Sequence, residues 1–355
     1  MFTTWRRLVK IVAKPLLILA DDLTGALDSA VSFAAPGRRV IFLRKPEAAA
    51  EALKSGPDVL AISTASREIP PDDAARRVEH VLSLLDRDAV GTVMKKVDSR
   101  LKGNIAAEVA ALRRWMAPAR SIACPAIPAM ARRVQGGALL GSGVETQIPV
   151  AACIGSGVEV PDIASDADLD RLVAGVMDDC LWIGARGLAF ALARRAGVAG
   201  PDRGGLRAPV MIVNGSRDPV TLAQLESLAG KTTLIQAPDG VSAVEPPPGS
   251  FVLSISDGGG GLSGQQASTQ FAQSALRLAN AARPASLVIC GGESAQAILD
   301  ELGIDNLQLI AELRAGLPLC EVRAPWGPVR LVTKSGGFGP PELLASILED
   351  TNADL

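Results

Sequence analysis

Short apolar runs, each followed by a stretch with helical spacing, recur through the first half of the chain. The run at residues 16–20 is uniformly apolar, which is typical of a strand buried on both faces. From Thr24 onward, Ala26, Leu27 and Ala30 recur at the spacing of an amphipathic helix. The predicted strands cover residues 16–20, 40–43, 59–63, 92–97 and 121–123. The predicted helices begin at Thr24 and then cover residues 46–53, 71–85 and 105–115.

A second alternating set follows a polar break at residues 199–207, which contains several glycines and a proline. Its predicted strands cover residues 210–213, 232–235, 251–254, 287–290 and 329–332. Its predicted helices cover residues 221–228, 267–282, 294–302 and 341–348. Alternation of this kind predicts an α/β fold with mostly parallel sheets flanked by helices. We expect two domains, residues 1–203 and 208–355, with the active site in the cleft between them.

Composition removes several classes of function. The formal net charge of −2 gives no basic surface for nucleic acid. The chain has no tyrosine and a single histidine, His80, in a stretch patterned as a helix surface. Catalysis by a Ser-His-Asp triad and metal sites built from histidines are therefore not expected, and no metal ligand is assigned.

Cysteine spacing and the N-terminal segment indicate a cytoplasmic protein. The five cysteines form no C-x-x-C pair, so neither a zinc site nor a disulfide framework is predicted. Residues 1–14 are basic, and the apolar run after them stops at Asp21, too early to span a membrane. We interpret this segment as a basic leader and expect no membrane partner. A homodimer is compatible with the sequence.

Polar clusters end three of the strands in the first half. Asp21 and Asp22 follow the first strand, residues 63–67 (Ser-Thr-Ala-Ser-Arg) end another, and residues 96–104 follow a third. Parallel strands place their carboxyl ends at one edge, so these groups are expected to share one crevice. Carboxylates accept hydrogen bonds from sugar hydroxyls, and arginine binds a carboxylate bidentately. A small acid carrying several hydroxyls fits both sets, whereas any one cluster alone is more typical of helix capping.

Glycine-rich turns follow three strands of the second half. They occupy residues 213–217, 289–294 and 332–339. Glycine allows backbone N–H groups to approach phosphate oxygens, and a lysine such as Lys334 can neutralise a phosphate. None matches the P-loop or the G-x-G-x-x-G dinucleotide pattern, and each pair alone is commonly a plain turn. The four glycines at residues 258–261 are interpreted as a flexible linker or lid.

Taken in order, these motifs resemble the four-carbon acid sugar kinase family. The resemblance runs from about Leu16 to Leu344. Its main motifs are residues 20–26, 64–67, 96–104, 125–128, 291–295 and 334–339.

The resemblance implies a two-domain kinase that uses ATP and Mg²⁺ to phosphorylate the terminal hydroxyl of an acid such as threonate, erythronate or an oxo-tetronate. It implies that the N-terminal domain binds the acid and that the C-terminal domain binds the nucleotide. The residues it places at the substrate are Asp21, Asp22, Ser66, Arg67, Lys96, Asp98, Ser99 and Arg100. Those it places at ATP are Ser216, Gly291, Gly292, Glu293, Ser294, Lys334, Gly336 and Gly337.

The chain departs from the family pattern at the substrate side. Arg100 stands for a threonine and Lys102 for an arginine, which replaces a bidentate fork by a point charge. Ala131 stands for a glycine before Arg132, and residues 140–166 form a shortened segment. The chain therefore resembles a divergent, shortened member.

Phosphoryl transfer needs positioning, charge neutralisation and a group that accepts the hydroxyl proton. We expect Asp22 or Asp98 to be that group, with Arg67, Lys96 and Arg100 holding the substrate carboxylate. A catalytically inactive sensor of sugar acid and nucleotide is the alternative that the departures suggest. A nicotinamide-dependent dehydrogenase is disfavoured because its glycine pattern is missing.

Overall fold

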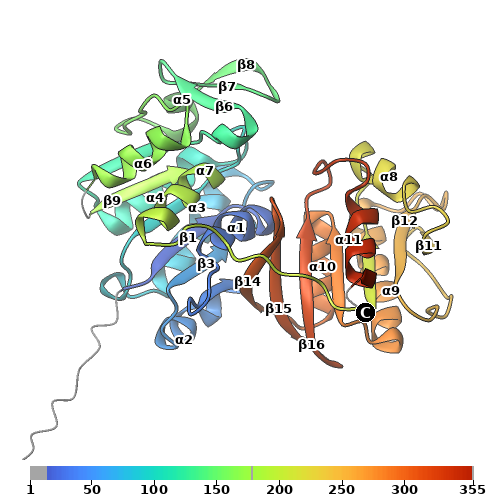
Figure 1. Cartoon of the computed structure of the whole chain (residues 1–355). Coiled ribbons are helices and arrows are strands. Elements are labelled where there is room, and N and C mark those ends of the chain that lie inside the picture. The colour runs from blue at the N-terminus through green and yellow to red at the C-terminus, as the bar shows by residue number, and fades with distance from the viewer. Residues whose placement is uncertain (1–13, 177–178, 354–355) are drawn as a thin grey trace, which may run out of the picture.

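A computed structural model describes residues 14–176 and 179–353 of the chain. Most of the basic leader therefore lies outside the described residues. The described strands form one 13-stranded sheet, in the order β11-β12-β10-β13-β16-β15-β14-β2-β3-β1-β4-β9-β5, and one small three-stranded sheet. Figure 1 shows two lobes side by side, with β14 and β15 between them. The α/β fold with mostly parallel strands is confirmed.

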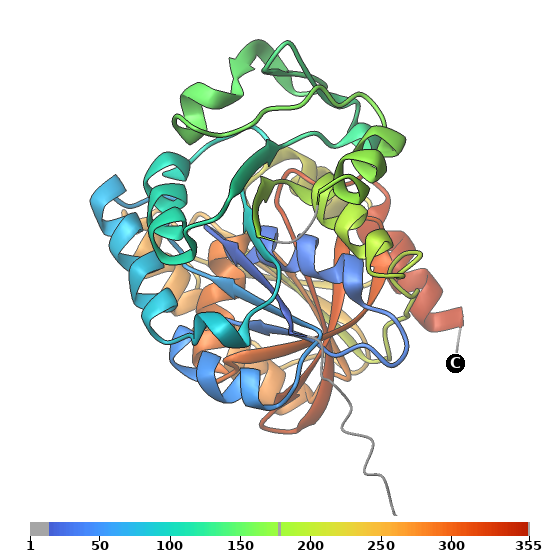
Figure 2. The same ribbon diagram turned by 90° about the vertical axis from the view of Figure 1, so that its left-hand side faces the viewer.

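The N-terminal lobe is a parallel sheet centred on β1, which pairs with β3 on one side and β4 on the other. Its strands are β1 (Leu16–Ala20), β2 (Val40–Leu43), β3 (Val59–Ser63), β4 (Val93–Lys96), β5 (Arg120–Cys124) and β9 (Cys180–Gly184). Its helices are α1 (Leu23–Ala30), α2 (Ala49–Lys54), α3 (Pro71–Ser83), α4 (Ile105–Met116), α5 (Val150–Ile154), α6 (Asp166–Ala174) and α7 (Arg186–Arg195). Short 3₁₀ turns cover Val31–Phe33, Pro46–Ala48, Arg87–Ala89 and Pro128–Met130. Figure 2 shows α3 beside α4 and, away from them, α1 beside α7, so that helices cover both faces.

The C-terminal lobe holds a second set of parallel strands. They are β10 (Val210–Asn214), β11 (Thr233–Pro238), β12 (Phe251–Ser256), β13 (Ser286–Cys290) and β16 (Gly327–Lys334). Its helices are α8 (Pro219–Glu226), α9 (Gly264–Ala282), α10 (Gly292–Glu301) and α11 (Leu343–Ala353). Because the strands are parallel, the turns after β10, β12, β13 and β16 share one edge.

An antiparallel pair that the sequence analysis did not predict joins the two lobes. β14 (Asn306–Arg314) pairs with β2 on one side and with β15 (Leu317–Ala324) on the other, and β15 continues to β16. The two predicted sheets are thus one continuous sheet. Figure 1 shows the chain between α7 and β10 running across this junction, and the backbone of Asp202 in it bonds to Ala34 of the N-terminal lobe and to Glu312 of β14. The boundary between residues 203 and 208 stays our proposal.

A small antiparallel sheet stands above the N-terminal lobe, as Figure 2 shows. It consists of β6 (Arg132–Gln135), β7 (Ala138–Gly141) and β8 (Val144–Pro149). The segment expected to be shortened, residues 140–166, supplies β8 and α5 and reaches the start of α6. Ala131, where the family pattern has glycine, takes a left-handed conformation with φ of 53°.

One smaller expectation agrees with the structure, since His80 lies on the exposed side of α3. The five cysteines are free thiols in the described part of the chain. Within residues 14–176 and 179–353, no helix is both long enough and apolar enough to cross a membrane.

Candidate active site

Arg67 is the centre of the polar cluster at the strand ends of the N-terminal lobe. Its Nε and Nη2 atoms each donate to a different carboxylate oxygen of Asp21, both at 2.8 Å. Asp21 ends β1 and is buried, whereas Arg67 follows the turn after β3. The pairing of β1 with β3 therefore brings the two side chains together. This is the two-pronged geometry that lysine cannot reproduce.

Two further carboxylates surround the same guanidinium. Asp22 accepts a hydrogen bond from Arg67 Nη1 at 3.1 Å, and Asp98 Oδ2 lies 3.9 Å from that atom. Burial alone would lower the pKa of Arg67, but the hydrogen bond to Asp21 and the nearby carboxylates raise it. Burial likewise opposes a charged Asp21, yet Arg67, Lys95 and Lys96 hold its pKa below the usual value. Arg67 and Asp21 are therefore both charged at neutral pH.

Asp22 has a structural duty besides any chemical one. It caps α1, since its Oδ1 accepts from the N–H of Gly25 at 2.9 Å and its Oδ2 from the hydroxyl of Thr24 at 2.7 Å. Lys96 approaches the same turn: its ammonium would stand 2.9 Å from a Cβ at position 25. Glycine at this position thus lets a carboxylate and an ammonium meet at the start of α1.

Asp98 shapes the loop after β4. Its Oδ1 accepts from the backbone N–H of Arg100 at 2.9 Å and of Lys102 at 3.3 Å. The side chains of Arg100 and Lys102 are exposed. At these two positions, where the chain departs from the family pattern, the backbone N–H groups and not the side chains therefore hold the loop geometry. Ser99 contacts the small sheet, because Arg132 Nη1 donates to its hydroxyl at 2.7 Å.

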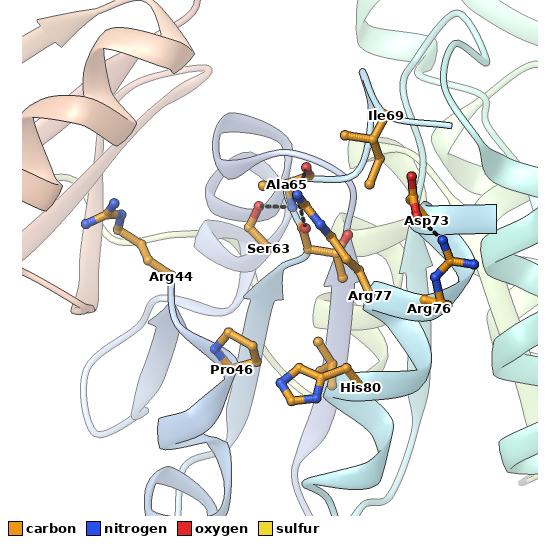
Figure 3. A pocket seen from close by; sticks show the side chains of 11 residues that line it. Arg44, Pro46, Ser63, Ala65, Ile69, Asp73, Arg76, Arg77 and His80 are labelled. Carbon is orange, nitrogen blue, oxygen red and sulfur yellow. Dashed lines mark hydrogen bonds and ion pairs between the residues drawn. The ribbon is translucent and has the colours of Figure 1, made fainter. Parts of the chain in front are cut away.

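Ser66, predicted to lie at the substrate, has a completely buried side chain. Its hydroxyl donates to Glu108 of α4. On the outer side of the same turn lies a pocket of about 540 Å³ between α3 and the end of β2. Figure 3 shows Arg77 beneath this turn, where it donates to the carbonyl of Ala65 at 2.5 Å.

The predicted nucleotide glycines gather at the strand ends of the C-terminal lobe. A Cβ at Gly291 would lie 3.5 Å from the backbone N of Ser216, and one at Gly336 would lie 3.1 Å from Asp218 Cβ. Gly291 has a φ of 103° and no side chain to cap α10, so the first N–H groups of that helix stay open to an anion. Glu293 is exposed, whereas Ser294 is buried against Gly215.

Lys334 differs from a lysine that reaches freely for phosphate. Its ammonium donates to the hydroxyl of Thr221 at 2.8 Å and to the carbonyls of Ser335 and Gly336 at 2.9 and 3.2 Å. All three donors are thus used inside the turn. Burial lowers the pKa of Lys334, although Asp218 and Cys290 act in the opposite direction. In this geometry Lys334 holds the shape of the Gly336–Gly337 turn.

The four-glycine loop is anchored at one point. Asp239 accepts from the N–H groups of Gly258 and Gly260, at 3.0 and 2.9 Å. The loop follows β12 at the same edge as the other glycine turns. A role for this loop as a lid stays a prediction.

The two clusters adjoin each other across the lobes. Gly292, the first residue of α10, lies so close to α1 that a Cβ on it would stand 3.5 Å from Thr24 Cγ2. The buried Arg44, just after β2, fastens the other end of α10 to the N-terminal lobe through Asp300 at 2.6 Å and the carbonyl of Ile304 at 2.7 Å. The polar cluster around Arg67 thus lies near the start of α10, through Asp22 and Thr24 at the start of α1.

Two buried charges in this region were missed from the sequence. Lys95 and Glu108 form an ion pair of 2.7 Å beneath the cluster, and both side chains are fully buried. A signal existed: helical spacing puts Glu108 on the face of Ile105, Val109 and Leu112. Lys95 interrupts a strand that is otherwise apolar at its start. Arg132 follows Ala131 in a motif of the sequence, from which no role in the site was predicted for it.

Among the described residues, no three His, Cys, Asp or Glu side chains gather in a way that could hold an ion. Mg²⁺ in kinases is held largely by phosphates and waters, with one or two carboxylates. Asp218, whose Oδ2 lies 3.1 Å from the position of a Cβ at Gly337, is a carboxylate beside this glycine turn.

Comparison with known proteins agrees with this division of the chain. Residues 16–152 match the family described as a sugar-binding N-terminal domain, and residues 252–344 match a nucleotide-binding C-terminal domain. D-threonate kinase of Bordetella bronchiseptica is 31% identical, over 92% of this chain and 95% of its own length. D-threonate kinase of Cupriavidus necator is 28% identical (91% and 94%), and 3-oxo-tetronate kinase of Methylobacterium radiotolerans is 26% identical (93% and 98%). The Bordetella alignment spans 395 positions, more than the 355 residues of this chain, so that relative carries residues that this chain lacks.

Two solved structures share the fold. A Salmonella typhimurium protein provisionally named a tRNA synthase gives a TM-score of 0.75 at 19% identity, covering 95% of this chain and 99% of that one. A Haemophilus influenzae protein gives 0.69 at 18% identity, covering 95% and 100%. With the identity and coverage of the threonate kinase and the two matching domains, the family is established. The chain belongs to the four-carbon acid sugar kinase family and is a sugar-acid kinase, a phosphotransferase with an alcohol group as acceptor.

Proposed function

We propose that this chain transfers the γ-phosphoryl group of ATP to the terminal hydroxyl of a four-carbon sugar acid of the threonate, erythronate or oxo-tetronate type. The observation that carries the proposal is the approach of Gly292 to Thr24, which sets the glycine turns beside the polar cluster. The names of the relatives support the substrate class. The transferred group needs little covalent help from the protein, so positioning and charge are the main contributions.

The acid is proposed to bind at the strand ends of the N-terminal lobe. Lys96, Arg100 and the outer edge of Arg67 supply positive charge for its carboxylate, and Asp22 and Asp98 accept from its hydroxyls. This orientation points the terminal hydroxyl toward the contact between Thr24 and Gly292, where the two lobes meet. The substrate role of Ser99 is kept in the proposal, with Arg132 as the residue that orients its hydroxyl.

ATP is proposed to bind at the glycine turns of the C-terminal lobe. Ser216, Gly291, Gly292 and the N-terminus of α10 would meet its phosphates, and Gly336 and Gly337 would let the nucleotide approach the backbone. Glu293 and Ser294 follow Gly292 in the first turn of this helix. When bound with the nucleotide, Mg²⁺ neutralises charge that develops on the phosphates.

Asp22 and Asp98 remain the two candidates for the group that accepts the hydroxyl proton. Replacing each by asparagine tests them. Asparagine caps a helix as well as aspartate does, so Asp22→Asn keeps the start of α1 and removes the base, together with one of the carboxylates around Arg67. Loss of about a hundredfold in kcat with an unchanged melting temperature identifies the base. If neither variant loses about that much, neither carboxylate is the base.

The proposal is tested by a panel of four-carbon acids screened for ATP-dependent ADP release. Turnover with at least one acid and none without acid is the expected result. If no acid in the panel stimulates ADP release, although ATP and an acid each raise the melting temperature, the protein is instead a sensor. Location in the cytoplasm and assembly as a homodimer stay predictions, to be checked by fractionation and by light scattering.

A further inference from the structure

The ion pair between Lys95 and Glu108 has no role in the proposed function, although it lies directly beneath the cluster around Arg67. Lys95 Nζ is 2.7 Å from Glu108 Oε2, and neither side chain has any exposed surface. Burying such a pair has a large desolvation cost, and an apolar pair of equal volume would often serve stability as well. A pair kept in this place therefore calls for an explanation other than stability.

The second oxygen of Glu108 connects the pair to the substrate cluster. Glu108 Oε1 accepts a hydrogen bond from the hydroxyl of Ser66, and the hydroxyl of Thr64 lies 2.6 Å from that of Ser66. Thr64 in turn contacts the carbonyl of Ala20, the residue before Asp21, at 3.0 Å. Because Ser66 gives its one hydroxyl proton to Glu108, the single proton of Thr64 goes either to Ser66 or to the carbonyl of Ala20. These buried polar contacts connect α4 with the ends of β3 and β1.

The turn that carries Arg67 is held on its other sides as well. Ala65 has a left-handed φ of 47°, which an alanine adopts only when its surroundings enforce it. Asn104 donates to the carbonyls of Ser66 and Ile69, at 2.9 and 2.7 Å, and Arg77 donates to that of Ala65 from the pocket side, as Figure 3 shows. Ser66 has its backbone N–H bonded to the carbonyl of Asp21. With all these contacts in place, Arg67 leaves the turn directed at Asp21.

We propose that Glu108, charge-balanced by Lys95, is a positioning residue that fixes Arg67 for the sugar acid through the hydroxyl of Ser66. Glu108 touches neither the substrate nor the reacting atoms; it sets the orientation of the turn at residues 64–67. This inference rests on the proposed function, because it assumes that the acid binds beside Arg67. Its consequence is that loss of the link weakens binding of the acid and leaves the nucleotide side unaffected.

Ser66→Ala breaks the link without disturbing the buried ion pair. We expect the KM and the calorimetric Kd for the acid to rise about tenfold, with the KM for ATP within about twofold of wild type and kcat little changed. Ser32→Ala is the matched control, because Ser32 is also fully buried but, within the described part of the chain, its hydroxyl bonds only to the carbonyl of Ser29, three residues earlier. A merely structural effect would lower the melting temperature in both variants and move neither KM selectively.

A pair of double variants tests Glu108 itself without leaving an unpaired buried charge. Lys95→Met with Glu108→Gln removes the ion pair but keeps an oxygen that can accept from Ser66. Lys95→Met with Glu108→Met removes that acceptor too. We expect the affinity for the acid to stay near wild type in the first and to fall about tenfold in the second.

The outcomes separate this inference from the proposed function. Equal acid affinity in wild type and Ser66→Ala, or equal affinities in the two double variants, would overturn the positioning role while acid-dependent ADP release persists. Failure of the proposed function would show in wild type itself, as ADP release that no acid stimulates. If acid still binds in that case, a selective loss of acid affinity in Ser66→Ala keeps the positioning role.

Discussion

Arg67 binds both carboxylate oxygens of Asp21, with Nε and Nη2 each 2.8 Å from a different oxygen. The pair crosses from the turn after β3 to the end of β1, so it fastens two parallel strands at the edge where ligands bind in such sheets. Asp22 and Asp98 approach the same guanidinium. Arg67 therefore organises three carboxylates while keeping part of its surface open.

Arg67→Lys keeps the charge but loses the fork. One ammonium cannot donate to Asp21 in two parallel bonds and still reach Asp22, so we expect a loss of about 1 to 3 kcal/mol in the free energy of unfolding. The KM for the acid should rise at least about tenfold, because the carboxylates lose their common partner. Denaturant unfolding and steady-state kinetics measure the two effects.

Arg76→Lys is the control for that substitution. Arg76 pairs with Asp73 on the exposed face of α3, where an ion pair contributes little. We expect both its stability and its kinetics to match wild type. Comparable losses in both variants would show that the two-pronged contact with Asp21 is unimportant.

Gly103→Ala tests how closely the loop after β4 covers the pair formed by Asp21 and Arg67. Gly103 has a φ of 94°, and a Cβ there would lie 3.0 Å from Asp21 Oδ2. Gly56→Ala is the control. Gly56 has a φ of 68° and no atom within 4 Å of its Cβ position, so an alanine there introduces backbone strain without a new contact. We expect Gly56→Ala to cost about 1 kcal/mol and Gly103→Ala about 2 kcal/mol or more, with a raised KM for the acid only in the latter. Equal costs in denaturant unfolding would mean that the contact is not tight.

Asp21 makes stability depend on pH in a defined direction. Its pKa is lowered in the folded state, so its contribution is fully present above its unfolded value of about 4 and is lost as the pH falls through the folded value. Asp21→Asn should therefore be less stable than wild type by a constant margin near about pH 7, and the margin should shrink below about pH 4. Urea unfolding at stepped pH measures the margin, and a margin that does not change on acidification would contradict the assignment.

Burial should protect most of the thiols. It raises the pKa of Cys290 and of Cys180 to about 11 and that of Cys124 to about 12, and Cys320 is also buried. At about pH 8 the native protein should react slowly with a thiol reagent and chiefly at the half-buried Cys153, whereas all five react after denaturation. Cys153→Ser should remove that reaction. Fast labelling of Cys290, beside the nucleotide turn, would show that this edge opens readily.

The sequence predicted the parts of the fold whose strands are buried on both faces. β1 is uniformly apolar, and β3 and β10 are apolar up to their last residues, Ser63 and Asn214. That pattern is distinct from a turn or an exposed helix. β14 was missed because it alternates buried and half-exposed residues and carries Gln308, Glu312 and Arg314. The strands of the small sheet are short and largely exposed, so their pattern is weaker still. The sequence did not predict that the lobes share one sheet, because the joining strand β14 has this weaker pattern.

For the site, position in the chain was a better guide than side-chain direction. The convergence of Asp21, Arg67 and Asp98 followed from parallel strands ending at one edge. The orientations of Ser66 and Lys334 did not, because each depends on a buried partner from a distant segment, Glu108 and Thr221. Such partners are set by tertiary packing, which spacing along the chain does not encode.

Phosphorus NMR of the product formed from ATP and the best acid tests the central claim most directly. If the carboxylate lies at the cluster around Arg67 and the far end of the acid faces the seam between Thr24 and Gly292, the product is a phosphomonoester on the terminal carbon. Its phosphorus signal is then split by the two protons of that carbon. A phosphoryl group on an internal hydroxyl, or an acyl phosphate on the carboxylate, would contradict the proposed orientation.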